Sequence, residues 1–464
     1  MNKKSPEIDC LAGIKYYSTT FKGIGGSIKK SDNDFYVKEI IDPYFLKELS
    51  EKKQDNKVFL VYEIKKKGLD SNHAILILKK KLGINFKIVG IKDARATTLQ
   101  YSSSEDNKKR LVKDIKIGEI YLNFLGYSKK PIEKSLLIGN KFTIKINNPI
   151  NKDNDNLSGF VSEIDNIGNF YGLQRFGSGR LVTHLVGKAI LKKNFNEAVD
   201  LLLTYATKYD SKYSIEIRER LKDIKNIPNT IKIIPKGMDI EKKIAQEIIK
   251  GKESIAVLRA IPINIRRLFV QAFQSFIFNQ VLSTAIENEY SLRKCERDDL
   301  CFEVIDKIVF GKIKRFENFD YSSSKYEKIP IIRLPGYAFQ PGKNRFDIII
   351  KEKLNNENLS AKDFFIKEMQ ELSEAGGFRQ AVFVSKDFKY TTKENSTMIE
   401  FDAPKGTYAT TLLREIIKPI DPISAGFWLI GKAIAKNKKY RYDNYQLLIF
   451  VVKWNSRKQR ITII

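Results

Sequence analysis

Histidine and cysteine are scarce in this sequence. The 464-residue chain has 2 histidines and 3 cysteines, which are His73, His184, Cys10, Cys295 and Cys301. An odd, small number of cysteines gives no even disulfide framework, and their spacing does not make a zinc-binding pattern with two histidines. We therefore expect no metal site and a reducing, cytoplasmic environment.

Long apolar runs are also missing. The strongest runs, at residues 426–430 and 447–452, are far shorter than the ~20 residues that a membrane-spanning helix needs. No apolar region follows the basic start at residues 1–4, so we expect no secretory signal. These features predict no membrane partner.

Two glycine-containing segments do not fit nucleotide-binding motifs. Residues 336–343 have five residues between the glycines rather than four, and Asn344 stands where a phosphate-binding loop needs Ser or Thr. Residues 23–26 lack the spacing of a dinucleotide-binding turn. We expect no cofactor, and no serine elbow or histidine cluster points to a hydrolase.

Positive charge is what the chain has in excess. Its 83 Lys and Arg residues against 55 Asp and Glu give a formal net charge of +28 at pH 7. Such a surface attracts polyanions, although a generally lysine-rich proteome would give the same composition. Three local basic runs, at residues 65–67, 79–81 and 108–110, predict phosphate contacts that position a nucleic acid without reading its bases.

Residues 90–100, GIKDARATTLQ, lie between these runs and carry our candidate nucleophile, Asp93. The β-branched run at residues 86–91 predicts a strand, and catalytic groups are often found where strands end. A turn or helix-capping role is the alternative for an aspartate at such a position.

This segment resembles the signature G-x-K-D-x-x-A-x-T-x-Q of the TruD family of tRNA pseudouridine synthases. Residues 169–177, NFYGLQRFG, resemble the second box of that family, N-[YF]-[FY]-G-x-Q-R-F-G. Residues 26–39 are similar to the opening motif of the family and residues 404–415 to its late motif. Because the motifs keep the family order from about residue 25 to residue 416, the resemblance covers most of the chain.

Four positions set this chain apart from the family pattern or vary within it. Gly168 stands where the family usually has proline, which frees the backbone before the second box. Asp70 and Ser71 replace Asn-Thr, which keeps helix-capping chemistry but adds negative charge near RNA. Tyr171 has a hydroxyl where some relatives have phenylalanine, and this hydroxyl either donates a proton or only forms a hydrogen bond.

The resemblance implies an isomerase that breaks the N1 glycosidic bond of uridine and rejoins the base to ribose through C5. Its implied partner is tRNA, at position 13 of the D arm, with no cofactor and no protein partner. A non-catalytic RNA-binding or tRNA-chaperone protein on the same fold is the alternative, and it would not need an intact Lys-Asp pair.

The family motifs also imply the site residues. Lys29 falls on the active-site lysine of the family and would keep Asp93 ionised. The carboxylate would then either add covalently to the ribose or base, or remove a ribose proton to give a glycal. The catalytic candidates are Asp93, Lys29, Tyr171 and Asn169. The substrate-binding candidates are Phe35, Lys92, Gln100, Arg175 and Arg414, with core packing the alternative for Phe35 and a buried ion pair the alternative for Arg175.

Hydrophobic patterning predicts an α+β architecture. We expect strands at residues 34–40, 57–64, 86–91, 115–125, 141–146, 380–390 and 398–403, a helix at 71–82, helical structure at 185–251 and 265–286, and exposed asparagine-rich loops at 151–156 and 355–358. The resemblance implies a pseudouridine-synthase catalytic domain with a mixed, largely antiparallel sheet, interrupted by a mostly helical TruD-type insertion domain. We place the catalytic domain at residues 1–189 and 381–464 and the insertion at 190–380. The role of the extension from about residue 418 is not predicted.

Overall fold

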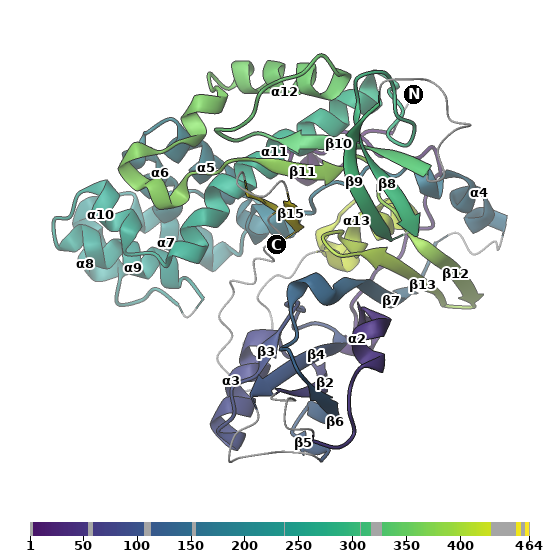
Figure 1. Cartoon of the computed structure of the whole chain (residues 1–464). Helices are drawn as coiled ribbons and strands as arrows, with labels where there is room; N and C mark the ends of the chain where they lie inside the picture. Colours follow the sequence, from purple (N-terminus) through teal and green to yellow (C-terminus); the bar gives the residue numbers. More distant parts are fainter. Residues whose placement is uncertain are drawn as a thin grey trace.

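A nine-stranded sheet forms the frame of the protein (Figure 1). The computed structural model describes residues 3–53, 59–105, 113–150, 155–235, 237–306, 308–316, 327–427, 452–455 and 460–463. The strands of the frame are β1 (Phe35–Ile41), β2 (Phe59–Lys67), β3 (Lys87–Ile88), β4 (Thr97–Glu105), β5 (Ile115–Ile117), β6 (Ile120–Ser128), β7 (Leu137–Asn147), β12 (Lys386–Lys393) and β13 (Ser396–Pro404).

Strand order explains why the sheet is mixed. The order is β12-β13-β7-β1-β4-β2-β6-β5, with β3 paired to β4. The β1–β4 pair is parallel, and the other pairings described for this sheet are antiparallel. The predicted α+β fold with a mixed, largely antiparallel sheet is confirmed.

Helices on the sheet follow from the apolar stripes of the sequence. Helix α3 (Ser71–Leu82) starts where the Asp70 carboxylate accepts the His73 N–H at 3.0 Å, and it ends at Gly83 with a φ of 70°. It packs Ala74 and Leu78 against β2 and β6. The predicted helix at residues 71–82 is confirmed. Helix α13 (Ala409–Ile417) packs in the same way on β7 and β13.

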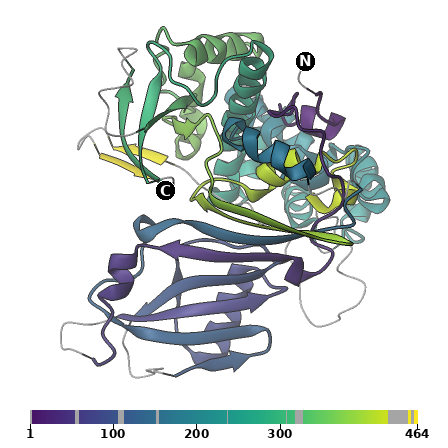
Figure 2. The ribbon, with the colours of Figure 1, turned by 90° about the vertical axis from the view of Figure 1, so that its right-hand side faces the viewer.

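The segment between β7 and β12 is mostly helical, as predicted. Its helices are α5 (Thr183–Leu191), α6 (Phe195–Thr204), α7 (Lys212–Leu221), α8 (Ile227–Thr230), α9 (Asp239–Ile249), α10 (Ser254–Arg259), α11 (Ile263–Glu287) and α12 (Arg345–Asn356), and α4 (Asp155–Glu163) precedes them. Helices α5 and α11 approach closely at Gly187, where a Cβ would lie 2.0 Å from the Phe269 carbonyl oxygen. Figure 2 shows these helices beyond the β12–β13 edge of the frame.

A second sheet in this segment was not predicted. It has the order β11-β10-β8-β9, formed by β8 (Leu300–Asp306), β9 (Val309–Arg315), β10 (Glu327–Leu334) and β11 (Gly377–Gln380). Pro330 lies inside β10 opposite Cys301, and a proline argues against a strand when the sequence is considered alone. The expectation of no disulfide framework also needs correction, because β8 brings Cys301 to Cys295 and the two form a disulfide, while Cys10 is free.

Other predicted boundaries shift by a few residues. The strand expected at residues 86–91 shortens to β3, because the chain leaves the sheet there to form the loop that carries Asp93. Helix α12 extends through Asn356, so the expected loop at 355–358 is partly helical. The remaining elements are α1 (Glu7–Cys10), α2 (Pro43–Lys47) and the paired strands β14 (Val452–Asn455) and β15 (Arg460–Ile463).

Candidate active site

Asp93 and Lys29 meet beside the loop between β3 and β4. The Lys29 Nζ lies 3.6 Å from the Asp93 Oδ2, and the lysine side chain is 4% exposed whereas the aspartate side chain is 19% exposed. Lys29 has a left-handed backbone with a φ of 56°, a conformation that costs a non-glycine residue about 1–3 kcal/mol. The structure thus joins two predicted residues and leaves the carboxylate reachable.

A buried ion pair shapes the loop from one side. The Lys92 Nζ lies 2.6 Å from the Glu39 Oε1, and the other oxygen of Glu39 accepts the Tyr101 N–H at 2.8 Å. A Cβ at Gly90 would lie 2.5 Å from both the Lys92 Nζ and the Glu39 Oε1. Gly90 therefore leaves room for this ion pair, and Lys92 forms it. The described contact of the Lys92 ammonium is with the Glu39 carboxylate rather than with open solvent.

Hydroxyl and amide groups hold the loop from a second side. Ser71 Oγ donates to Gln100 Oε1 at 2.7 Å and accepts the Lys92 N–H at 2.9 Å. Gln100 is buried, so the structure places it behind the loop. Ser71 provides the hydroxyl that links helix α3 to the loop that carries Asp93.

Lys66 contacts the backbone of the same loop, and the sequence analysis did not single it out. Its Nζ donates to the carbonyl oxygens of Leu69, Lys92 and Asp93 at 2.6, 3.4 and 3.2 Å. Burial lowers the pKa of Lys66 to about 8. Its place in the basic run 65–67 suggested a phosphate contact, but the strand alternation Tyr62, Ile64, Lys66 points to the core face.

The second box is built around an arginine that sequence reasoning missed. Arg379, on β11, donates from Nε to the Asn169 carbonyl at 3.0 Å and from a terminal nitrogen to the Asn169 Oδ1 at 2.8 Å. Its other terminal nitrogen donates to the Gly406 carbonyl at 2.7 Å, and its guanidinium lies 4.0 Å from the Tyr171 ring centroid. One side chain therefore joins the second box to the late motif.

Tyr171 is also fixed through its backbone. Asn279, on α11, accepts the Tyr171 N–H at 2.8 Å and donates to the Tyr171 carbonyl at 3.0 Å. The Tyr171 ring makes edge contacts with Phe278 and Tyr408. The predicted residues Asn169 and Tyr171 are both buried, and Arg379 contacts both of them.

Gln174 connects the second box to the nucleophile candidate. It is the second residue of a short 3-10 helix, Leu173–Phe176, and its Nε2 lies 3.5 Å from the Asp93 Oδ2. Gln174 was not among the candidate site residues, whereas the structure aims its amide at the carboxylate. An amide donor at this position can orient an anionic oxygen without neutralising it.

The remaining predicted binding residues contact the protein itself. Arg175 Nε donates to Ser275 Oγ at 3.0 Å, and Arg414 Nε lies 2.8 Å from the buried Asp9 Oδ2. Phe35 is buried against Phe142 and lies under the Lys29 ammonium, at 4.6 Å from its Nζ. A small pocket has Arg414, Asp9 and Gln174 among its lining residues, but Asp93 does not line it.

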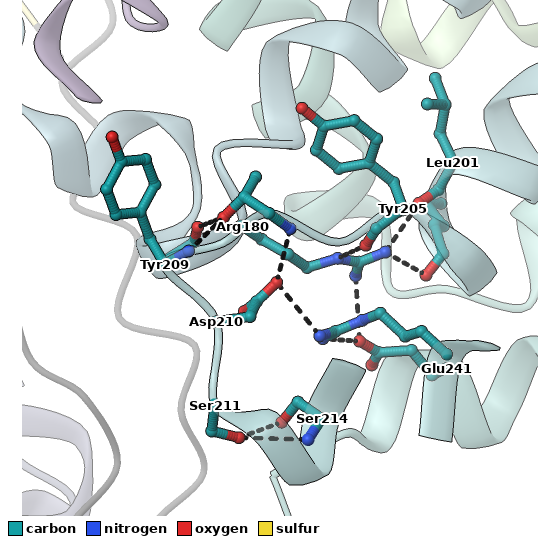
Figure 3. Close-up of polar contacts among 12 residues, drawn as sticks. Arg180, Leu201, Tyr205, Tyr209, Asp210, Ser211, Ser214 and Glu241 are labelled. Carbon is teal, nitrogen blue, oxygen red and sulfur yellow. Dashed lines mark hydrogen bonds and ion pairs between the residues drawn. The ribbon is translucent and has the colours of Figure 1, made fainter. Parts of the chain in front are cut away.

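A second charged cluster anchors the continuation of the second box (Figure 3). Arg180 extends a terminal nitrogen to within 2.9 Å of the Glu241 Oε1, and it also donates to the carbonyls of Tyr205 and Leu201 at the end of α6. Arg218 lies 2.8 Å from the same Glu241 oxygen and 3.4 Å from Asp210. These side chains fasten the helical segment to the loop that carries Gln174.

His184 and the described acidic residues give no sign of a metal centre. His184 is packed between the rings of Phe176 and Phe276, and burial lowers the pKa of its imidazole to about 3. Within the described ranges, no three His, Cys, Asp or Glu side chains are grouped as metal ligands. The described helices include none with the length and apolar character needed to cross a membrane.

The two lysine runs within the described residues differ in how exposed they are. Residues 65–67 end β2 and mix one buried with two more accessible lysines. Residues 79–81 form the basic last turn of α3, where all three lysines are exposed. The third run, 108–110, lies outside the described residues.

Comparisons with known proteins agree with this geometry. The family model for tRNA pseudouridine synthase D (TruD) matches residues 11–416. A relative from Methanosarcina acetivorans named "Probable tRNA pseudouridine synthase D" is 30% identical over 446 residues, which cover 90% of this chain and 98% of the relative. A relative of the same name from Archaeoglobus fulgidus is 30% identical and covers 88% of this chain and 98% of its own length.

A solved structure gives the same answer for the fold. The crystal structure of a TruD protein from Methanosarcina mazei matches with a TM-score of 0.73 and 28% sequence identity, over 91% of this chain and 100% of that one. The predicted catalytic fold with its insertion is therefore confirmed, and the exact domain boundaries stay a prediction.

Proposed function

This chain belongs to the TruD family of tRNA pseudouridine synthases, and we propose that it isomerises uridine 13 in the D arm of tRNA with Asp93 as the nucleophile. The enzyme class is that of its family, an isomerase. The observation that carries the role of Asp93 is its partly exposed carboxylate beside the buried ammonium of Lys29. A group that only bound phosphate would gain nothing from a carboxylate at that point, which disfavours a non-catalytic RNA-binding protein.

The proposed reaction begins with the target nucleotide outside its stack. Flipping a base costs a few kcal/mol, which stacking and edge contacts must offset. We assign the Tyr171 ring as the platform for the uracil and Asn169 as a residue that positions this ring. Arg379 contacts both residues, and Asn279 holds the Tyr171 backbone. Lys29, held against the Phe35 ring, places its ammonium next to the attacking carboxylate.

Two chemical routes are open to a carboxylate in this position. Addition to C1′ of the ribose or to the base gives a covalent adduct, whereas removal of the 2′ proton gives a glycal. In both routes the N1–C1′ bond breaks, the uracil turns, C5 bonds to C1′ and the C5 proton leaves. No electron donor or acceptor takes part in this balance, which is why we propose no redox cofactor.

The direct test is to incubate purified protein with unmodified tRNA transcripts and map pseudouridine at single-nucleotide resolution. We expect product at position 13 without added nucleotide or reductant. Product at another position alone would overturn the proposed specificity, and no product in any tRNA would overturn the activity. A transcript with cytidine at position 13 is the matched control. A cytoplasmic location follows from tRNA as substrate and stays a prediction.

A further inference from the structure

Lys66 is a buried cation directly behind the proposed nucleophile. It lies near the end of β2 with 1% of its surface exposed. Its neighbour Lys65 on the same strand is exposed, as expected when successive side chains point to opposite faces. An ammonium is expensive to bury without partners, so its presence here calls for a specific role.

The partners of Lys66 are three backbone oxygens. Two of them, from Lys92 and Asp93, belong to the nucleophile loop, and the third, from Leu69, belongs to the turn before α3. A protonated lysine has three N–H donors, which matches the number of acceptors. The neutral amine has two, so deprotonation leaves one carbonyl of this set without a donor.

Charged groups face Lys66 from each element packed around it. Asp70 at the start of α3, Asp93 in the loop and Glu39 on β1 raise the pKa of Lys66, while Lys92 and burial lower it, with burial the strongest influence. His73 contacts Asp70 from the first turn of α3. The balance of these groups puts the ammonium within reach of titration near neutral pH.

We propose that Lys66 is a positioning residue for the reaction, whose ammonium fixes the backbone on both sides of Asp93 and so aims the carboxylate. This inference rests on the proposed function of Asp93. Misplacement of a reacting group by about 1 Å costs on the order of 100-fold in rate. The loop is therefore correctly set only while Lys66 is protonated, and isomerisation falls at alkaline pH.

Asp70 is a residue of this chain that influences the charge of Lys66. The family pattern has asparagine at this position, whereas here a carboxylate lies close enough to favour the charged form of Lys66. Asparagine caps a helix about as well as aspartate, so Asp70→Asn removes the charge and keeps the start of α3. The departure noted in the sequence thus extends the active pH range of the enzyme upward.

The test is the single-turnover rate constant with saturating tRNA from about pH 6 to about pH 10. We expect an alkaline loss of rate in the wild type near the pKa of Lys66, about 8. Asp70→Asn should move this loss to lower pH. Lys66→Met should be roughly 10- to 100-fold slower near neutral pH, with this pH dependence abolished and tRNA affinity within about threefold. Lys116→Met, at an exposed position of strand β5, is the control and should behave as wild type.

Two results would overturn the proposal. One is a Lys66→Met rate within about twofold of wild type with the alkaline loss intact, which would assign that loss to another group. The other is an unchanged pH profile in Asp70→Asn, which remains informative even if Lys66→Met does not fold. Asp93→Asn distinguishes a failure of the proposed function from a failure of the role of Lys66. Activity in Asp93→Asn would overturn the proposed function. An inactive Asp93→Asn together with a Lys66→Met variant that behaves as wild type would overturn only the role of Lys66.

Discussion

Two carboxylates in this protein face cations in opposite ways. Glu241 is 1% exposed and one of its oxygens lies 2.9 and 2.8 Å from two arginines. Asp93 is 19% exposed, and its closest described cation is a lysine at 3.6 Å. The first carboxylate is buried and shared by two guanidinium groups, and the second is held by a loop and partly exposed.

The difference fits a structural role for Glu241 and the proposed reactive role of Asp93. Arginine forms directional, multiple hydrogen bonds that fill the lone pairs of a carboxylate, while lysine provides a compact charge at longer range. The loop that carries Asp93 is held through its backbone, by Lys66 at the Asp93 carbonyl and by Ser71 at the Lys92 N–H. A nucleophile needs this arrangement, since its side-chain oxygen must stay free to attack.

The sharpest way to break the comparison is Asp93→Asn. This change keeps the size of the side chain but removes the anionic oxygen, so pseudouridine formation should drop below detection. Affinity for tRNA should stay within about 1 kcal/mol, and the melting temperature should not fall. Asp165→Asn is the control, because Asp165 lies in an exposed turn after α4. Substantial product from Asp93→Asn would place the active carboxylate elsewhere.

Glu241→Gln tests the structural member of the pair. It leaves Arg180 and Arg218 buried without their shared counter-charge, and breaking such a cluster costs about 3 kcal/mol. We expect this loss in the free energy of unfolding, measured by urea denaturation. The rate constant per folded molecule should remain near wild type. Glu219→Gln, which breaks the exposed pair with Lys222, should not change stability measurably, and an equal loss there would contradict the argument.

Lys29→Met removes the cation beside Asp93 and keeps much of the aliphatic side chain. Turnover should fall by roughly 10- to 100-fold, less completely than in Asp93→Asn, because the carboxylate remains but loses its charged neighbour. Steady-state kinetics with tRNA would measure the loss in kcat. The exposed neighbour Lys30 offers the control substitution Lys30→Met. Equal, complete inactivation by Lys29→Met would instead give the ammonium a direct part in the chemistry.

Tyr171→Phe should have the smallest effect. The described contacts of the Tyr171 side chain involve its ring, with Arg379 over the face and Phe278 and Tyr408 at the edges. We expect turnover within about twofold of wild type, and a loss of at least about 100-fold in Tyr171→Ala. If Tyr171→Phe lost orders of magnitude, the hydroxyl would take part in proton transfer.

Sequence reasoning succeeded where the signal is local. Helix α3 was found with its ends because its cap, its apolar stripe and its final glycine are contiguous. Strand β10 was missed because Pro330 obscures it. Arg379 carries no local signal at all, since its role depends on Asn169, more than two hundred positions earlier in the chain. The alternation of apolar and polar residues along β2 indicates that Lys66 points inward, but the basic run considered alone does not show this.

The pairing of β7 with β13 has a consequence for synthesis. Asn147 lies opposite Ser396, so roughly 250 residues must be translated before β7 acquires its second neighbour. At bacterial or slower elongation rates this takes roughly 10 to 50 s. During that interval a nascent chain presents an unpaired strand edge, which is a template for aggregation. The insertion thus delays closure of the catalytic frame until the helical segment has been translated, so the unpaired edge of β7 is present in the nascent chain and absent from the finished enzyme.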